Sequence, residues 1–332
     1  MKLKQSDPKK NNRIWMQNLQ LRLGYENNDV LLPIYFNDKE IKILEAEGLR
    51  KPNYILPNGV GVGYGYFKMD SGTRSFLLEN LPKINDPYLR GIIWLNVWED
   101  MLNGNIEPVE MIELCINALK TEDDILNTQR ILARLNSTFW NFLTQDQRQD
   151  KAVELESILS QHMNEANTIT TRSMYFRSLR SMILTDNGYE WLKSVWMKTD
   201  SIKGITLSER DYITIASELA LRGRDDNQKI LTTQVDRISN PDRKARFEFI
   251  IPSLSNDSNV RDNFFELIKK EENREIEPWV QSAVAYLHHP LRSKEAEKYI
   301  RPSLELLEEI QKTGDIFYQL DLLEQHFQGI KV

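Results

Sequence analysis

The stretch that decides the fold is DPYLRGIIWLNVWEDMLNG, residues 86–104. Its apolar residues recur every three or four positions, which is the spacing of one face of an α-helix. Asp86 and Pro87 are typical of a helix start, because aspartate caps free backbone N–H groups and proline is tolerated in the first turn. Gly104 supplies the stop, since glycine accepts the left-handed conformation that often ends a helix. We therefore predict a helix that begins at Pro87 and ends before Gly104.

The same start signals recur down the chain. They occur at Glu107-Pro108, at Ser208 with Asp211, at Asn240-Pro241, and near Ser258 and Glu275. Roughly thirteen or fourteen helices are expected from residue 71 onward. Helices joined by short connections, with no strand between them, favour stacked pairs over a single bundle. Because the pairs do not repeat in sequence, we predict an irregular α–α superhelix, a HEAT- or armadillo-like array, over residues 71–332. Its concave face would be a natural binding surface.

Residues 13–70 have a β pattern. Apolar and polar residues roughly alternate in residues 14–23 and 39–45, and residues 30–36 are apolar and mostly β-branched or aromatic. The alternating glycines of GVGVGYG, residues 59–65, fit a strand pair better than a phosphate-binding loop. The sequence therefore predicts a mostly α protein with a small β-sandwich domain at residues 13–70. Residues 1–12 are polar and basic, and we expect a disordered leader there and no signal peptide.

The composition excludes several classes of protein. The 332 residues are 40% hydrophobic, with 43 basic and 49 acidic residues and a net charge of −6. The mixed charge argues against a nucleic-acid or membrane-surface partner. No apolar run approaches the ~20 residues of a transmembrane helix. The single cysteine, Cys115, cannot form an intrachain disulfide, which leaves the compartment open between cytoplasm and export.

The residues of common catalytic sites do not occur in the required patterns. The sequence contains no H-E-x-x-H, no G-x-S-x-G and no P-loop. Its four histidines are His162, His288, His289 and His326, and none lies three or four residues from another. We therefore expect no catalytic residue, no metal-binding residue and no cofactor in this chain. Cys115 lies on the apolar side of its predicted helix, so we expect a core residue there. Six tryptophans at helical spacing are also expected in the core: Trp94, Trp98, Trp140, Trp191, Trp196 and Trp279.

Several segments, in order, resemble the carboxy-terminal region of aminopeptidase N-type enzymes, in particular the bacterial branch. YILPNG at residues 54–59 and GYGYF at residues 63–67 are similar to the end of the β-sandwich domain in that family. The helix with Leu77 and Leu78 and residues 86–101 resemble the first helical pair. The later segments that carry the resemblance are residues 175–180, 274–280, 288–292 and 311–317.

The resemblance implies that the chain is the non-catalytic half of a zinc aminopeptidase, a peptide hydrolase. An amino-terminal β-domain and a thermolysin-like catalytic domain would precede Met1. That catalytic domain would carry G-x-M-E-N, which holds the substrate amine, and the zinc-binding H-E-x-x-H. None of these motifs is present here, so no catalytic position carries over.

In this family the helical domain forms a bowl over the active site, and it limits access and can contact the far, carboxyl end of the peptide. The implied partners are the enzyme's own catalytic domain and a peptide substrate. Basic side chains on the concave face suit a peptide carboxylate. The candidates are Arg177, Arg180, Arg274 and Arg292, each of which could instead be exposed or form a salt bridge between helices. The alternative function is a free-standing helical-repeat scaffold that binds a partner protein.

Overall fold

The computed structural model describes residues 1–26 and 28–313. The chain divides into two compact units, Met1–Leu135 and Asn136–Val332. The boundary lies inside helix α4 (Ile125–Asn141), and the change from strands to helices at residue 70 lies within the first unit. Gly314, which the sequence predicts to end a helix in the left-handed conformation, lies outside the described residues. The end of the 311–317 segment and His326 lie outside them as well.

The first unit begins with two small antiparallel sheets. One pairs β1 (Lys2–Lys4) with β4 (Glu40–Lys42), and the other has the order β3-β2-β5, formed by Asp29–Phe36, Gln17–Gly24 and Tyr54–Leu56. Side chains alternate between the two faces of a strand, so Leu19, Leu21 and Leu23 point to one side of β2. These leucines form one core with residues of β3 and with partly buried residues of the smaller sheet.

The expected disordered leader at residues 1–12 contains a strand. Leu3 pairs with Ile41, and the ammonium groups of Lys2 and Lys4 lie 2.5 and 3.0 Å from the Glu40 carboxylate. Leu3 also packs against the strand core. One apolar residue between lysines is too short a pattern to predict a strand, because the pairing partner lies far along the chain.

The predicted strand pair at residues 59–65 is wrong, because residues 57–66 form a loop. The Asn58 side chain donates to the Gly63 carbonyl at 3.1 Å and accepts from the Gly63 amide at 2.8 Å. Gly61 and Gly65 have φ angles of 74° and 142°, which are incompatible with a regular strand. The glycines therefore serve a tight loop.

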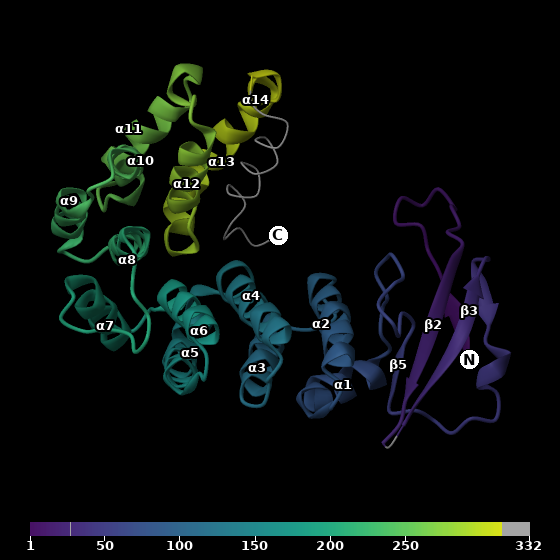
Figure 1. The fold of residues 1–332 in the computed structure, drawn as a ribbon. Coiled ribbons are helices and arrows are strands. Elements are labelled where there is room, and N and C mark those ends of the chain that lie inside the picture. The colour runs from purple at the N-terminus through teal and green to yellow at the C-terminus, as the bar shows by residue number, and fades with distance from the viewer. Residues whose placement is uncertain (27, 314–332) are drawn as a thin grey trace. The chain divides into compact units, whose positions relative to one another are not determined.

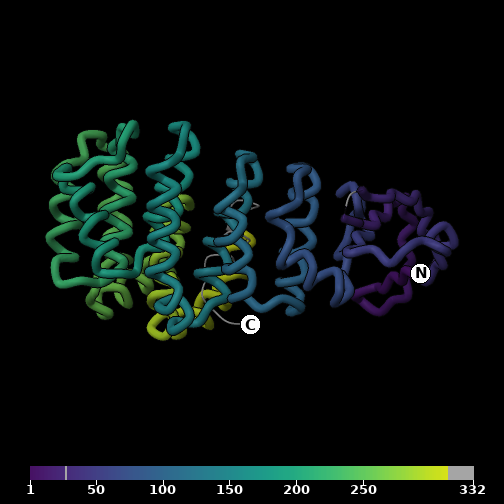
Figure 2. Tube along the Cα trace, turned by 90° about the horizontal axis from the view of Figure 1, so that it is seen from below, coloured from purple at the N-terminus to yellow at the C-terminus, as the bar shows by residue number. Residues whose placement is uncertain are grey.

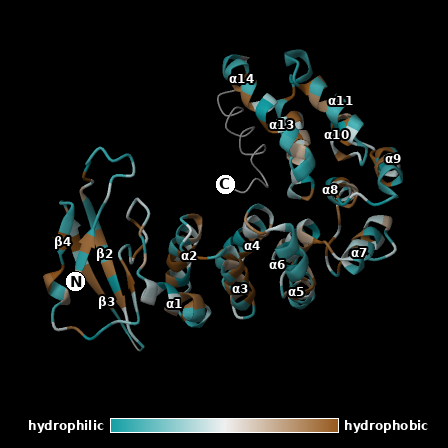
Figure 3. Ribbon diagram, turned by 180° about the vertical axis from the view of Figure 1, so that it is seen from behind, coloured by the Kyte–Doolittle hydropathy of each residue, from teal (hydrophilic) through white to brown (hydrophobic). Residues whose placement is uncertain are grey.

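The helical part of the first unit begins at the predicted residue. Helix α1 (Ser71–Asn80) is capped by Asp70, and α2 (Pro87–Leu102) is capped by Asp86, whose side chain accepts from the Tyr88 amide. Helix α3 spans Pro108–Leu119, and η1 (Leu44–Ala46) and η2 (Leu81–Lys83) are short 3-10 turns. Figure 3 shows the hydrophobic colour on β2 and α3, in agreement with their buried residues.

The second unit consists of helices in the described residues. Their bounds are α5 (Gln145–Glu165), α6 (Ile169–Met182), α7 (Asp186–Met197), α8 (Glu209–Leu221), α9 (Asn227–Arg237), α10 (Pro241–Leu254), α11 (Ser258–Ile268), α12 (Glu277–Leu287), α13 (Ser293–Glu305) and α14 (Leu307–Thr313), with 3-10 turns η3 (Glu271–Asn273) and η4 (Pro290–Arg292). Consecutive helices pack in pairs, and α6, α8, α10 and α12 form a layer that α5, α7, α9 and α11 flank (Figure 1). Figure 2 shows α5 to α10 side by side with roughly aligned axes. The mostly helical class is confirmed.

Arginines close the carboxyl ends of many helices in this unit. A helix leaves its last carbonyls without partners inside the helix, and a cation there also suits the helix dipole. Arg148 donates to the Leu143 carbonyl at 2.7 Å, after the end of α4, and Arg172 donates to the Met163 carbonyl at 3.0 Å, near the end of α5. Arg222 and Arg237 reach back to the Ile183 and Trp196 carbonyls in the same way. These arginines join each helix end to a later helix.

Candidate functional site

A cavity of about 450 Å³ opens between α8, α10 and α12. Its walls carry three arginines and three aromatic side chains among smaller residues. We call it the basic–aromatic cavity and define it by Arg210 and Ser217 of α8, Arg246 and Phe247 of α10, and Trp279 and Tyr286 of α12. Its size falls in the range of small-molecule pockets, which bind through apolar walls and a few placed polar groups.

The charge of this cavity is only partly neutralised. Arg243, at the wall, forms an ion pair of 3.0 Å with Glu209. Arg246 Nη2 donates to Ser282 Oγ at 2.8 Å. Among the described residues, neither Arg246 nor Arg210 forms an ion pair with a carboxylate. Asp242 also lines the cavity and opposes part of this charge, so a smaller net positive charge remains available to an anionic ligand.

The aromatic residues give the cavity its apolar surface. Trp279 is partly buried, unlike the fully packed core tryptophan Trp94, and its ring lies 5.8 Å from that of Phe249. Burial raises the pKa of Tyr286 to about 12, so this phenol stays neutral at physiological pH. Tyr286 of α12 and Ser217 of α8 both line the cavity wall. The expectation of a core role for Trp279 is therefore corrected, because the side chain lines a cavity.

Arg180 of α6, one of the predicted site residues, lies close enough to the cavity residue Tyr286 for that residue to affect its pKa. Its side chain is 12% exposed, and its Nη1 lies 4.0 Å from Asp211 Oδ1. Within the described part of the chain, its Nε and Nη1 atoms have no hydrogen-bond partner. Burial lowers the pKa of Arg180, and the neighbouring Glu218, Asp211 and Tyr286 oppose that effect. A buried guanidinium with unused donors is unfavourable unless an anion completes its hydrogen bonds.

Arg177 lies one turn earlier on α6 but is exposed. Its Nε donates to the Ser173 carbonyl of its own helix at 3.2 Å. The two predicted arginines of α6 therefore have different environments. The Arg180 guanidinium lies 5.5 Å from the centre of the Phe176 ring, whereas the Arg177 side chain is exposed.

Arg274 and Arg292 close helix ends, as the arginines described above do. Arg274 Nη1 donates to the Ile268 and Lys269 carbonyls at 3.1 and 2.5 Å, and its Nη2 pairs with Glu309. Arg292 donates to the Ser253 and Leu254 carbonyls at 2.5 and 2.9 Å, 39 and 38 residues earlier. The structure thus assigns both a packing role, and it does not gather the four predicted arginines into one site.

Sequence reasoning missed Arg210, Arg246 and Tyr286. Arg210, Thr214 and Ser217 follow one another at three- and four-residue intervals on α8, so they share one helix face. A polar face of this kind was visible in the sequence, but it does not distinguish a cavity wall from a solvated surface. The partners on α10 and α12 come from distant parts of the chain.

The other candidate groups lie outside the cavity. Cys115 of α3 is fully buried, and burial raises the pKa of its thiol. The His289 ring packs 4.5 Å from that of Trp140, and burial together with nearby arginines lowers its pKa well below the ordinary value. In residues 1–26 and 28–313, no group of three or more histidine, cysteine, aspartate or glutamate residues could hold a metal ion. No helix in that part of the chain is both long and apolar enough to cross a membrane. Models of known protein families and curated proteins both give no match to this chain.

Proposed function

We propose that this chain is the non-catalytic carboxy-terminal part of a zinc-dependent aminopeptidase, which removes amino-terminal residues from peptides. In this proposal the two small sheets form a β-sandwich, and the helices form an irregular α–α superhelix. The helical part caps the active site of the catalytic domain and shapes peptide access. Zinc belongs to that catalytic domain. The observation that carries the proposal is the basic–aromatic cavity.

The chemistry of this cavity suits the far end of a peptide. A peptide ends in a carboxylate, and Arg246 and Arg210 offer guanidinium groups that form no ion pair within the described part of the chain. Trp279 and Phe247 suit an apolar side chain near that end. The unused donors of Arg180, close to Tyr286, add a third positive group behind the wall.

The order of elements also supports the proposal. The segments that resemble the end of the β-sandwich domain in that family lie in β5 and the following loop, directly before α1. The segment that resembles its first helical pair lies in α2. Hydrogen bonds between helices recur at a separation of about 38 residues along the sequence. They join Tyr189 to Asp226 (37 residues apart) and Trp196 to Gln234 (38 residues apart). A regular spacing of this kind is typical of stacked helical pairs.

The first experiment measures peptide binding to the whole chain by fluorescence anisotropy. One labelled peptide with an apolar last residue is used with a free carboxylate and with an amidated carboxyl end. We expect the free form to bind about tenfold or more tightly, because amidation removes the charge that the arginines would meet. Equal binding of the two forms would contradict the assignment of the cavity to a peptide end.

Matched variants locate the binding. Arg246→Gln removes an arginine of the cavity that holds no helix end, and Arg177→Gln removes an exposed arginine of the same unit. We expect R246Q to weaken binding of the free-carboxylate peptide about tenfold and R177Q to leave it unchanged. A loss of the same size in both would indicate nonspecific charge attraction.

The aminopeptidase parentage has its own test, which is the reading frame upstream of Met1. An H-E-x-x-H motif in frame within a few hundred codons supports the proposal. A stop codon followed by a ribosome-binding site would refute it and favour the protein-binding scaffold. In addition, the chain mixed with zinc and aminoacyl-nitroanilides should show no turnover above background.

A further inference from the structure

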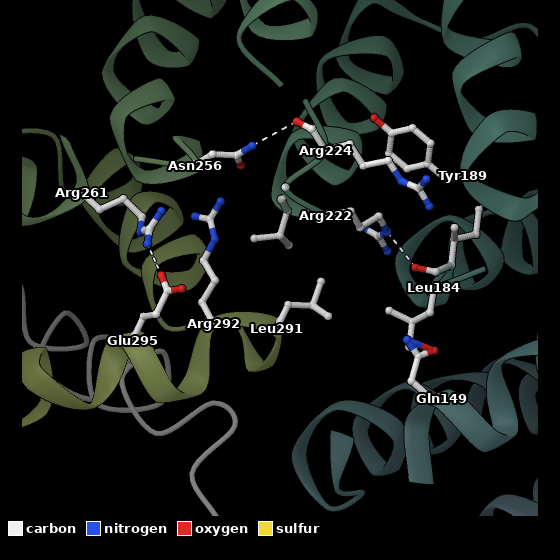
Figure 4. A pocket seen from close by; sticks show the side chains of 13 residues that line it. Gln149, Leu184, Tyr189, Arg222, Arg224, Asn256, Arg261, Leu291, Arg292 and Glu295 are labelled. Atoms are coloured by element: carbon white, nitrogen blue, oxygen red, sulfur yellow. Dashed lines mark hydrogen bonds and ion pairs between the residues drawn. The ribbon is translucent and has the colours of Figure 1, made fainter. Parts of the chain in front are cut away.

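A second cavity of the helical unit, of about 350 Å³, is lined by arginines that the proposed function does not use. It lies where several connections between helices meet. Leu184 comes from the α6–α7 connection, Arg222 and Arg224 follow α8, and Arg292 and Glu295 come from η4 and α13 (Figure 4). Arg261 of α11 completes the set. We call this cavity the arginine pocket, defined by Arg222, Arg224, Arg261 and Arg292.

The lining of the pocket is unbalanced in charge. Four guanidinium groups line it, and Glu295 is the only carboxylate among the described lining residues. Glu295 pairs with Arg261, but its side chain is 59% exposed while that of Arg261 is 5% exposed. An ion pair with such an exposed partner is weak and can be exchanged for another anion. Arg224 pairs with Asp186, whose side chain is 86% exposed.

The hydrogen bonds show which arginines are free to bind. Arg222 uses all five of its donors, on the carbonyls of Ile183, Arg180, Ser181 and Glu218 and on the Glu218 carboxylate. Arg292 uses two, on the Ser253 and Leu254 carbonyls, and Arg261 donates to the Ser255 carbonyl and to Glu295. Arg222 therefore shapes the pocket, while Arg224, Arg261 and Arg292 keep N–H groups that no other described residue uses.

The guanidinium groups of Arg261 and Arg292 are both buried and lie close together. Figure 4 shows the guanidinium groups of Arg261 and Arg292 on the same side of the pocket. Burial, followed by the charge of Arg261, lowers the pKa of Arg292 to about 10, which the Glu295 carboxylate only partly opposes. Two like charges at this depth repel each other unless a counter-charge lies between them.

We propose that the arginine pocket binds the phosphate group of a small molecule. A phosphate monoester carries close to two negative charges at neutral pH and three acceptor oxygens, which match the two buried guanidinium groups and their unused donors. Leu221, Leu291 and the Tyr189 ring supply apolar wall for the organic part of the ligand. The volume lies at the small end of ligand pockets, which suits a compact molecule. This assignment does not depend on the aminopeptidase proposal.

Isothermal titration of the whole chain tests the proposal at fixed ionic strength. The probes are inorganic phosphate, glycerol 3-phosphate and citrate. We expect saturable binding of at least one phosphate probe, and the tighter of the two identifies free phosphate or a phosphate ester as the ligand class. Citrate that binds as tightly as both phosphate probes would overturn the phosphate assignment, and so would the absence of saturable phosphate binding.

Two pairs of variants separate the pocket from the surface without disturbing the helix ends that Arg261 and Arg292 hold. Arg224→Gln removes a pocket arginine, and Arg301→Gln removes an exposed arginine of α13. Glu295→Gln frees Arg261, and Glu305→Gln removes an exposed carboxylate of the same helix. We expect R224Q to weaken phosphate binding about tenfold and E295Q to tighten it severalfold, with R301Q and E305Q unchanged. Equal effects within each pair would refute the pocket as the binding site.

Discussion

Glu156 of α5 holds the α6–α7 connection, and its removal should destabilise the helical unit. Its Oε1 accepts from the Leu184 and Thr185 amides at 2.7 and 2.8 Å, and its Oε2 accepts from the Thr185 hydroxyl at 2.5 Å. Thr185 in turn caps α7 through the Gly188 amide. Glu156 itself is 8% exposed. The carboxylate is therefore a single link between three elements.

The magnitude follows from the three lost bonds. Hydrogen bonds to a charged group contribute about 1.5–3 kcal/mol each, and buried donors without partners add a cost. Water can reach Leu184 and Thr185 in part, because both are only half-buried. We therefore expect Glu156→Ala to lower the free energy of unfolding by about 3 kcal/mol. Glu156→Gln keeps one acceptor and gains an amide donor for the Thr185 hydroxyl, so about 1 kcal/mol is expected.

Urea-induced unfolding measures this change, followed by far-UV circular dichroism and by hydrogen exchange in peptides from α5 and α7. The matched control is Glu154→Ala on the same helix, because Glu154 is 49% exposed and lies 3.4 Å from Lys151. That variant should change the unfolding free energy by less than about 0.5 kcal/mol. If E156A and E154A have the same effect, the carboxylate does not hold this connection.

Three further predictions concern single side chains. In Gly188→Ala the added Cβ would lie 2.2 Å from Glu156 Oε2, so this variant should have a lower free energy of unfolding in urea than the parent chain. The decrease should be smaller in the Glu156→Ala background, where that oxygen is absent. Additive decreases in the double variant would show that the Cβ and the carboxylate do not collide. Hydrogen bonds from the Ser239 amide and hydroxyl lower the pKa of Glu209 from 4.5 to about 2, so this carboxylate stabilises the fold above pH 4.5 and the contribution is lost as the pH falls towards 2. The melting-temperature difference between the parent chain and Glu209→Gln should therefore shrink over that range, and a difference independent of pH would refute the assignment. Cys115 should react with a thiol reagent only after unfolding, because the side chain is fully buried and burial raises its pKa; fast reaction of the native chain would disprove the packing of α3.

The helix starts could be predicted from the sequence because their signals are local. Asp86 with Pro87 and Ser208 with Asp211 act within one turn, and the structure has a side-chain cap at both starts. The start near Glu275 was two residues early, since α12 begins at Glu277 after Ile276, which makes no side-chain cap. Local capping chemistry therefore fixes helix boundaries well where a capping side chain exists.

The features that the sequence did not predict depend on distant partners. Strand β1 forms because Leu3 meets Ile41, and Arg292 closes the end of α10 from 39 residues away. An arginine can be solvated, form an ion pair or cap a helix end, and the sequence alone does not show which of these partners it has. For that reason Arg292 was predicted as a peptide contact, whereas its guanidinium donates to backbone carbonyls.

The arginine pocket follows from the way this unit joins its helices. The end of α10 and the α6–α7 and α10–α11 connections present free carbonyl groups, and arginines from later helices satisfy them. A guanidinium has five donors, and the helix ends take one donor of Arg261 and two of Arg292, which leaves further donors on these two pocket-lining arginines. Where several such ends converge, the spare donors and the positive charge accumulate together, as at Arg261 and Arg292. An anion bound there would complete both the hydrogen bonds and the charge balance, and ligand binding and helix capping would then stabilise the same residues.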